Sequence, residues 1–565
     1  MDDKQHRERE GFFGAAKLVA GLTLLSRVMG MVRDIAITSL GATRANAAFV
    51  MAFQIPNLFR RLFGEGALAG AFVPVFTETG QKSGPDKAAR LLANALGLLA
   101  VFLLALMLLI EFVLLVWSVV WPGEADRQLL IGLTAVMLPF MVTICLLALG
   151  SAALNCRKHF AYPAAAPMIL NVLIIAAAVA VERSWEGQLP RQLYVIAASV
   201  TAAGIVQLAG VIWMLRRSGL PTRPRLRPVE PGIRPMLRLM APMLLGLGFL
   251  QISPFFDSII IWVFTASEPG STNPLAVATQ VQVYAAQRLY QFPMGVLAIS
   301  LGVAVFPLLS LYAAREDIPS LRDSVNRAIR LSIMEGLATG TGMFVLAEPI
   351  TRLIFRHGDF HEAQIPAAAF VLQMYCLGMW AYCAYQIFSR AFYAMKDTKT
   401  PLKVSCALMA LNMALVVALI WTPLKAGAFG AATSLTASMS VVILAVILRR
   451  RLGRIGAGRI AVSIGRTVIA CGAMAVVVAW LMAELRGATA WIVPNVIGVG
   501  PMLRDWVGLG AALHGEAAKN WVVVAVCVPS GAAVFFLTAW FLRAPELGEL
   551  FGALRRARPA ADLPA

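Results

Sequence analysis

The sequence predicts an all-α polytopic membrane protein, and two observations carry this prediction. Of the 565 residues, 59% are hydrophobic and only 14% are charged, which is typical of a membrane protein and not of a soluble one. Apolar runs long enough to cross a bilayer as helices also recur from end to end. We expect about 14 transmembrane helices, in two pseudo-symmetric six-helix bundles around a central cationic cavity plus two C-terminal helices.

The expected spans follow the apolar runs in chain order. The first run comes after a polar tail, MDDKQHRERE, and carries Lys17, Arg27 and Arg33. Because it lacks a clean apolar stretch with a small-residue cleavage site, we expect a retained span and not a signal peptide. The predicted spans are residues 14–41, 47–77, 91–120, 129–153, 163–182, 193–215, 236–264, 277–312, 328–354, 365–393, 401–421, 427–448, 460–484 and 521–542.

Two short similarities indicate an internal duplication. Segments 153–163 (ALNCRKHFAYP) and 391–401 (AFYAMKDTKTP) are both basic turns that end in a proline, and RRLF and QRLY align Arg61 with Arg288 at nearly the same spacing. Same-direction repeats of this kind enclose a central cavity. The expected divisions are a cytoplasmic N-terminal tail (1–12), a first six-helix lobe (13–216), a cytoplasmic basic linker (217–235), a second six-helix lobe (236–450), two additional helices with a periplasmic loop at 485–520 (451–543) and a cytoplasmic tail (544–565).

The net charge of +19 predicts the orientation of the chain. Lys and Arg are concentrated in alternate loops, such as residues 216–238, 396–403 and 449–459. They outnumber those of the opposite side roughly threefold, which by the positive-inside rule places both termini in the cytoplasm. Because the charge is dispersed over many short loops, it favours contact with anionic lipid headgroups and not with nucleic acid.

No pattern of an enzyme or a metal site is present in the sequence. The seven cysteines include no CxxC pair and read as small apolar residues. His357 and His361 lie near acids, but Gly358 between them favours a solvated loop over a metal site. There is no nucleophile elbow, phosphate-binding loop or HExxH motif. We expect a transporter that is not an enzyme and has no cofactor.

Five arginines lie inside the predicted spans: Arg27, Arg33, Arg60, Arg61 and Arg288. An arginine at the centre of a membrane helix costs about 2.5–3.5 kcal/mol, so we expect these side chains to face a polar cavity. Glycines and prolines interrupt the same spans, and such breaks are tolerated at membrane depth where they are protein-buried or line a wet cavity. Guanidinium groups suit bidentate binding of diphosphate oxygens. The pattern predicts a transporter of an anionic substrate.

The alternative is that these arginines form internal salt bridges that hold kinked helices together. Arg61 and Glu65 are four residues apart, and Arg27 and Asp34 are seven apart, so each pair lies on one helix face. These two acids do not balance five arginines, which leaves positive charge for a ligand. Both explanations stay open for the individual pairs.

The motifs that carry a family resemblance are LLSRVMGMVRD, FQIPNLFRRLFGEGALAGAFVPVF, RLYQFPMGVLAISLGVAVFPLLS and RAFYAMKDTKTPLKV. Together they resemble the MurJ/MviN family of bacterial lipid II flippases, in the multidrug/oligosaccharidyl-lipid/polysaccharide exporter superfamily. The resemblance implies a cationic cavity between two bundles, and two further helices that line a groove for the lipid tail. It implies alternating-access transfer of lipid II, undecaprenyl-diphosphate-MurNAc-pentapeptide-GlcNAc, to the periplasmic leaflet of the bacterial inner membrane for cell-wall synthesis. The implied substrate-binding residues are Arg27, Arg33, Arg60 and Arg288, with Ser26, Asp34, Arg61 and Glu65 as supporting or gate positions.

The chain departs from the family pattern at Ala47, Gln287 and Gln291, where acids are usual. We expect a more positive cavity that holds diphosphate more tightly or relies less on salt bridges at its outer gate. Asp257, in the seventh predicted span, is a weak candidate for Na⁺ or H⁺ coupling, and a hydrogen-bonded Asp beside the Pro254 kink explains it equally well. Membrane potential is another candidate energy source.

Other functional classes fit the residues less well. An exporter of another polyprenyl-diphosphate-linked saccharide fits the charge of the cavity and is the alternative that we keep. A drug or cation antiporter would need acids in the cavity, and a non-transporting scaffold would need no intramembrane arginines. We expect a monomer that binds lipid II and membrane lipids and associates with the cell-wall synthesis machinery.

Overall fold

The computed structural model of the chain describes residues 21–60, 62, 68–184, 187–266, 272–454, 456–495 and 516–548. Over these ranges the elements are helices, and no β-strand occurs among them, which confirms the all-α class. The chain divides into two compact units, one of residues 1–273 and 277–281 and one of residues 274–276 and 282–565. The lobe boundaries expected from the sequence stay a prediction.

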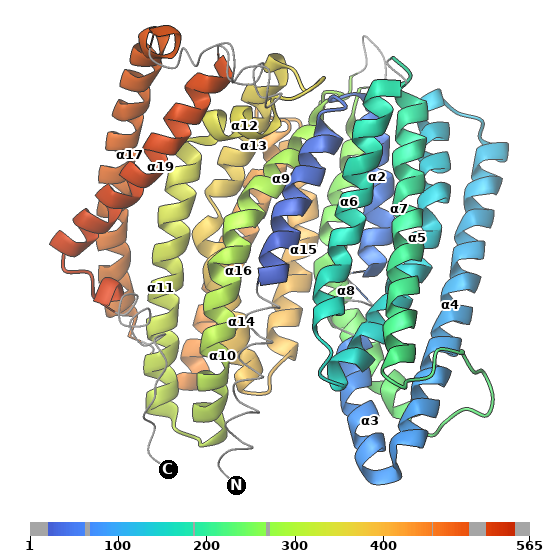
Figure 1. Ribbon diagram of the computed structural model, residues 1–565. Helices are drawn as coiled ribbons and strands as arrows, with labels where there is room; N and C mark the ends of the chain where they lie inside the picture. Colours follow the sequence, from blue (N-terminus) through green and yellow to red (C-terminus); the bar gives the residue numbers. More distant parts are fainter. Residues whose placement is uncertain are drawn as a thin grey trace. The chain divides into compact units, whose positions relative to one another are not determined.

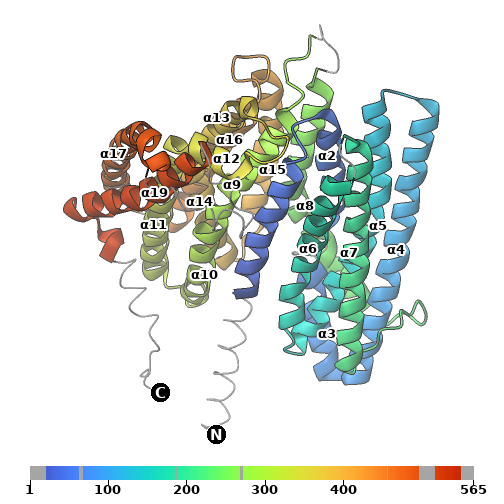
Figure 2. The ribbon, with the colours of Figure 1, turned by 45° about the horizontal axis from the view of Figure 1, so that its top comes forward.

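The first unit is a bundle in which α5 packs against α2, α4 and α7. Helices α5 and α7 run side by side in both views (Figures 1 and 2). Thr43 caps the start of α2 by accepting a hydrogen bond from the backbone N–H of Asn46 at 3.2 Å. The helices of this unit are residues 21–38, α2 (Arg44–Phe59), α3 (Leu68–Ser83), α4 (Pro85–Val120), α5 (Ala125–Cys156), α6 (Ala161–Ser184), α7 (Leu189–Arg217) and α8 (Ile233–Phe264).

The second unit is built around α11, which packs against α14 and α17. Its apolar core joins α11, α14 and α16, and a second core joins α11 to α17 and α19. Helix α9 begins at the end of the first unit and continues into the second. The elements are α9 (Thr279–Val296), α10 (Ala298–Ala314), α11 (Ile318–Val345), α12 (Ala347–Phe355), the 3₁₀ turn η2 (Glu362–Gln364), α13 (Ile365–Cys376), α14 (Met379–Ala394), α15 (Lys399–Leu419), α16 (Gly427–Leu452), α17 (Ala457–Asn495) and α19 (Glu516–Phe541).

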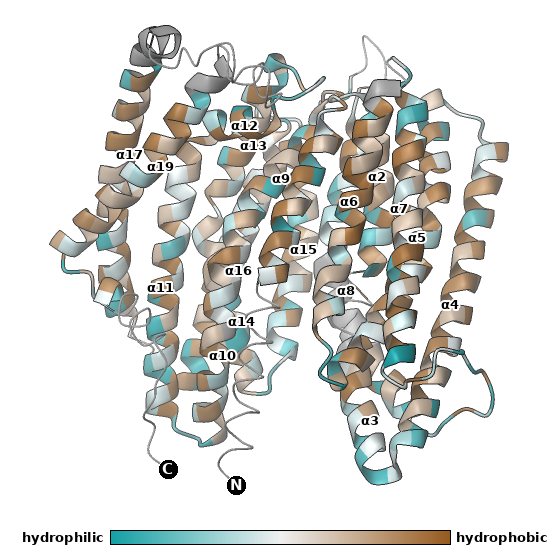
Figure 3. Ribbon diagram, viewed as in Figure 1, coloured by the Kyte–Doolittle hydropathy of each residue, from teal (hydrophilic) through white to brown (hydrophobic). Residues whose placement is uncertain are grey.

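The helices are long and apolar enough to span a membrane many times. Within the described ranges, 9 helices meet this criterion, or up to 11 if each of two bent pairs forms one span. The bent pairs are α11 with α12, at 73°, and α13 with α14, at 41°. Hydrophobic residues recur along the helices (Figure 3), and α4 exposes large apolar side chains such as Leu108, Phe112 and Val119. These findings establish a multi-span membrane protein, and the count of 14 spans stays a prediction.

The basic linker after α7 is bound to α4 of the first unit. The backbone N–H of Arg225 donates to the carbonyl of Ala93 at 2.9 Å, and the Asn94 amide donates to the carbonyl of Arg225 at 3.1 Å. A Cβ on Gly97 would lie 2.4 Å from this same Arg225 oxygen, so the close approach requires glycine. The linker is therefore a docked segment and not a free tether.

A buried ion pair fixes the segment after α19 to α11 in the second unit. The Arg330 guanidinium binds the Glu546 carboxylate, and the side chain of Glu546 is only 1% exposed. Arg330 Nε also donates to Asn326 Oδ1 at 3.0 Å, and the Ser463 hydroxyl donates to Glu546 Oε1 at 2.8 Å. We call these four residues the Arg330 cluster.

Candidate functional site

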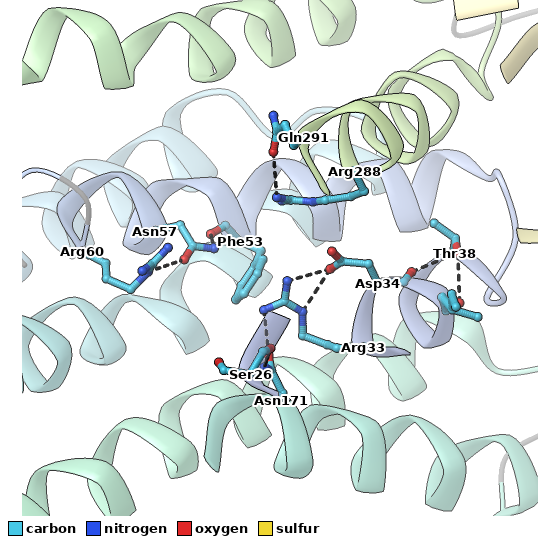
Figure 4. A network of polar contacts seen from close by, with 11 residues as sticks. Ser26, Arg33, Asp34, Thr38, Phe53, Asn57, Arg60, Asn171, Arg288 and Gln291 are labelled. Carbon is cyan, nitrogen blue, oxygen red and sulfur yellow. Dashed lines mark hydrogen bonds and ion pairs between the residues drawn. The ribbon is translucent and has the colours of Figure 1, made fainter. Parts of the chain in front are cut away.

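The helix at 21–38 presents Arg33 to a network of polar side chains in the first unit (Figure 4). Arg33 Nε and Nη2 donate to Asp34 Oδ1 at 3.0 and 2.7 Å. Its Nη1 donates to Asn171 Oδ1 of α6 at 3.1 Å, and the Asn171 amide donates in turn to the carbonyl of Ser26 at 3.2 Å. The guanidinium also lies 5.6 Å from the centre of the Phe53 ring. Arg33 is thus oriented by one carboxylate, one neutral amide and one ring.

Arg60 is held in a similar way directly after α2. Its Nε donates to Asn57 Oδ1 at 3.1 Å, and the Asn57 amide donates to the carbonyl of Phe53 at 3.2 Å. Pro56 lies inside the same helix and removes one backbone donor from it. A neutral amide acceptor orients the guanidinium without cancelling its charge.

Arg33 and Arg60 line the same cavity, which lies entirely within the first unit and has a volume of about 470 Å³. The described residues around it include no carboxylate. Apolar residues of α5 and α6 form much of the wall. The polar lining residues are Ser26, Arg33, Asn57, Arg60, Ser151, Asn155, Asn171 and Gln207. We call this space the arginine cavity.

Arg288 lies on α9 in the second unit. Its guanidinium lies 4.6 Å from the centre of the Tyr284 ring, and its Nη1 donates to Gln291 Oε1 at 3.5 Å. Gln287 donates to the hydroxyl of Tyr375 at 3.1 Å. At two positions where the family resemblance leads us to expect acids, the side chains are therefore neutral amides, one bonded to Tyr375 and one to Arg288.

The other residues singled out from the sequence do not all line the arginine cavity. Arg27 is half-buried on the helix at 21–38 and is not among the described residues lining the arginine cavity. Ser26 does line it, and Asp34 is the buried ion-pair partner of Arg33. Arg61 and Glu65 lie outside the described residues. Ala47 is buried on α2.

Asp257 is buried on α8 and is 6% exposed. Its neighbour Ser258 accepts hydrogen bonds from the amides of Gln54, at 2.6 Å, and Gln280, at 2.9 Å. The Oδ1 atom of Asp257 has no hydrogen-bond partner among the described residues. No group of three or more His, Cys, Asp or Glu side chains suitable for a metal ion occurs in the part of the chain that the structure describes.

A second cavity, of about 360 Å³, lies in the second unit between α11, α17 and α19. Its wall is mostly apolar and includes Met334, Met474, Val528 and Phe535. Glu335 of α11 is also part of the lining. Such a wall suits a hydrocarbon chain.

The sequence interpretation missed the amides that orient the arginines. Asn57, Asn171 and Gln207 are single polar residues inside apolar stretches, and such residues in a span are costly unless they find a partner. This cost is the feature of the sequence from which a hydrogen-bonding role for these three residues could have been predicted. Their identity as partners of Arg60, Arg33 and the α6 backbone depends on tertiary contacts.

Comparison with known proteins gives consistent matches. The family described as "Lipid II flippase MurJ" matches residues 36–497. The probable lipid II flippase MurJ of Rhizobium tropici is 28% identical over 549 residues, covering 96% of this chain and 96% of that protein. The lipid II flippase MurJ of Burkholderia cenocepacia is 32% identical over 408 residues, covering 70% of this chain and 76% of that protein.

Solved structures share the fold. A lipid II flippase MurJ in an inward closed conformation matches with a TM-score of 0.69 and 20% identity, covering 93% of this chain and 99% of that chain. An inward-facing multidrug resistance MATE family transporter of the MOP superfamily matches with a TM-score of 0.63 and 14% identity, covering 78% of this chain and 98% of that chain. At these identities the matches establish the architecture alone.

Proposed function

The chain belongs to the lipid II flippase MurJ family, and from this premise we propose how it moves its substrate. The protein is a transporter and not an enzyme, and its substrate is lipid II. Lipid II moves from the cytoplasmic to the periplasmic leaflet, where it supplies cell-wall synthesis. The arginine cavity is the observation in the structure that supports this function most directly.

The cavity has the charge that a diphosphate requires. Arg33 and Arg60 line it without a carboxylate among the described lining residues. The neutral amides of Asn171 and Asn57 contact the two guanidinium groups, and Asp34, which is not among those lining residues, pairs with Arg33. Guanidinium forks bind phosphate oxygens in bidentate geometry, and charge-assisted hydrogen bonds are roughly twice as strong as neutral ones. The two arginines therefore bind the diphosphate that links the prenyl chain to the saccharide.

The rest of the substrate is assigned by chemistry. The polyprenyl tail occupies the apolar cavity between α11, α17 and α19, because that wall matches a hydrocarbon chain. Arg288 and Arg27 contribute further positive charge to the diphosphate during alternating access. Movement of the two units against each other exposes the headgroup first to one side of the membrane and then to the other.

Location and energetics complete the proposal. The protein lies in the bacterial inner membrane with both termini in the cytoplasm, in keeping with the concentration of Lys and Arg in alternate loops. It acts as a monomer beside the cell-wall synthesis machinery. Two negative charges that move outward across an inside-negative potential gain roughly 4–5 kcal/mol per 100 mV, which favours export of the diphosphate. Asp257 is the candidate for additional Na⁺ or H⁺ coupling.

Depletion of the protein in its own bacterium tests this function. Lipid II in the outer leaflet is expected to become inaccessible to an externally added lipid II-cleaving toxin. Wild-type protein should restore cleavage, whereas Arg27→Ala, Arg33→Ala, Arg60→Ala and Arg288→Ala should not. Arg223→Ala, in the exposed linker, is the control that should restore it. Unchanged cleavage on depletion would contradict the assignment and favour export of another polyprenyl-diphosphate-linked saccharide.

A further inference from the structure

Gln207 of α7 combines deep burial with an unused hydrogen-bond acceptor. Its side chain lines the arginine cavity and is 1% exposed. Its Nε2 donates to the carbonyl of Ala166 on α6 at 2.7 Å. Its Oε1 is buried and has no hydrogen-bond partner among the described residues. A buried acceptor without a donor is costly, so its retention in this cavity calls for an explanation.

The orientation of this amide is fixed by its surroundings. Because the Ala166 carbonyl can only accept a hydrogen bond, the nitrogen of Gln207 must face it, and the oxygen is the end that has no hydrogen-bond partner among the described residues. The hydroxyl of Tyr162 donates to the backbone carbonyl of Gln207 at 2.7 Å, which holds this turn of α7 against α6. The acceptor is therefore a built feature of the cavity wall and not one of two interchangeable amide orientations.

The missing donor cannot be the diphosphate. An ionised diphosphate linkage has only acceptor oxygens, which suit the donors of Arg33 and Arg60 but not the carbonyl oxygen of an amide. A saccharide offers hydroxyl and acetamido N–H donors. The sugar bonded directly to the diphosphate is the part of the headgroup that covalent linkage keeps nearest to the arginines.

The cavity contains a second set of groups that suits a sugar. Ser151 and Asn155 of α5 also line it, and their spacing of four residues places them on one face of that helix. Both are uncharged, and each can donate and accept hydrogen bonds. The volume of about 470 Å³ is at the lower part of the range of small-molecule sites, so it suits the portion of the headgroup nearest to the diphosphate.

We propose that Gln207 is a specificity residue that reads the sugar attached to the diphosphate: its Oε1 accepts a hydrogen bond from a hydroxyl or acetamido N–H of that sugar. The inference rests on the proposed function, because it assumes that Arg33 and Arg60 bind the diphosphate. It adds a contact that distinguishes a polyprenyl-diphosphate saccharide from a bare polyprenyl diphosphate.

The test measures dissociation constants of the purified full chain for three probes: undecaprenyl diphosphate, undecaprenyl-diphosphate-N-acetylglucosamine and lipid II. The variant Gln207→Met keeps the length of the side chain and removes its acceptor. We expect it to weaken binding of both sugar-bearing probes by about 3- to 10-fold, the worth of one neutral hydrogen bond, and to leave undecaprenyl diphosphate unchanged. The matched control is Gln192→Met, a buried position on the same helix outside the cavity lining, which should change none of the ratios between probes.

The ratio of the dissociation constants decides the question even if Gln207→Met perturbs the fold, because a general perturbation weakens all three probes alike. An unchanged ratio would overturn the inference and leave the proposed function intact. Weaker binding of lipid II alone would place the donor on the peptide or the second sugar and would also overturn it. If wild-type protein binds none of the three probes, the proposed function itself fails.

Discussion

The arginine cavity of the first unit and the Arg330 cluster of the second show two ways in which this chain buries a guanidinium. In the cluster, the Arg330 charge meets a Glu546 carboxylate that is 1% exposed, and Asn326 and Ser463 complete the hydrogen bonds. In the cavity, Arg33 and Arg60 lie against neutral amides at the edge of an open space. Asp34 contacts only one edge of Arg33.

This difference shows which feature separates a structural arginine from a binding arginine. Burial alone does not, because Arg330 is the more buried of the two kinds. The open space that Arg33 and Arg60 line is the distinguishing feature, because Arg33, like Arg330, also pairs with a carboxylate. A carboxylate inside a packed core offsets the charge and fixes the fold, whereas a guanidinium that lines a cavity can still bind a ligand there.

The largest effect is expected from removing the ion pair of the Arg330 cluster. Glu546→Ala removes the carboxylate that binds the buried Arg330 guanidinium, which should lower the free energy of unfolding by about 3–5 kcal/mol. The loss is measured by thermal unfolding of the purified protein in detergent. The double variant Arg330→Met/Glu546→Leu should recover most of the stability because it removes both charges. A loss as small as that of an exposed pair would show that the cluster does not fix the C-terminal segment.

The next largest effect is expected from substituting an arginine of the arginine cavity. Arg60→Ala should weaken binding of undecaprenyl diphosphate by about 10- to 100-fold, since a hydrogen bond to a charged group contributes roughly 1.5–3 kcal/mol. The unfolding temperature should change little, because Asn57 lines the cavity and water can solvate its amide oxygen once Arg60 is removed. Arg223→Ala in the exposed linker is the control for binding. Large destabilisation by Arg60→Ala would place Arg60 with Arg330 as a structural residue.

Asn171→Asp would place a second carboxylate beside Arg33 and so make its surroundings more like those of Arg330. The new carboxylate would take the place of the amide oxygen that now accepts from Arg33 Nη1 at 3.1 Å. We expect about tenfold weaker binding of undecaprenyl diphosphate, because the added negative charge competes with the ligand for the guanidinium. The same dissociation constant measured for Asn171→Ala is the comparison. Equal losses in the two variants would mean that the amide matters only for orientation.

The smallest effect is expected for the ion pair between Asp397, in the loop before α15, and Arg451, in the last turn of α16. Arg451 Nη1 lies 2.6 Å from Asp397 Oδ2. Desolvation raises the pKa of Asp397, but hydrogen bonds from Thr400 and the charge of Arg451 outweigh it and lower the pKa below its usual value. The pair therefore stabilises the fold above the usual Asp pKa of about 3.9, and this contribution is lost as the pH falls through the lower folded-state pKa.

Unfolding temperatures of wild-type protein and Asp397→Asn, compared between about pH 7 and pH 3, measure that contribution. The difference should be small at neutral pH and should shrink as the pH falls below the usual Asp pKa of about 3.9. A difference that grows in acid would contradict the lowered pKa.

The class of the fold could be predicted from the sequence because apolar runs of bilayer length require helices. The breaks were also visible, since Pro293 and Gly295 precede the interruption at Leu297 between α9 and α10. Arg33 and Arg60 could be predicted because a charged side chain in a span is costly. The i,i+7 spacing of Arg27 and Asp34 did not reveal that Asp34 pairs with its neighbour Arg33, because adjacent residues on a helix are not usually on one face.

The amides of the cavity could not be assigned from the sequence. Asn171 meets Arg33 across 138 positions of the chain, and Gln207 meets Ala166 across 41. Such contacts depend on how α6 and α7 pack against the helix at 21–38 and against each other, which no local pattern encodes. Arg330 and Glu546 are separated by 216 positions for the same reason.

The arginine cavity lies within the first unit. Binding of the substrate there is therefore a separate matter from the direction in which the substrate is transported. Contacts that remain inside one rigid unit keep their strength whichever side of the membrane the unit faces. A ligand that is bound equally well in two states cannot shift the balance between them. Under the proposed function, Arg33, Arg60 and Gln207 select the cargo, and the bias toward release arises outside this cavity, with the membrane potential as one candidate source.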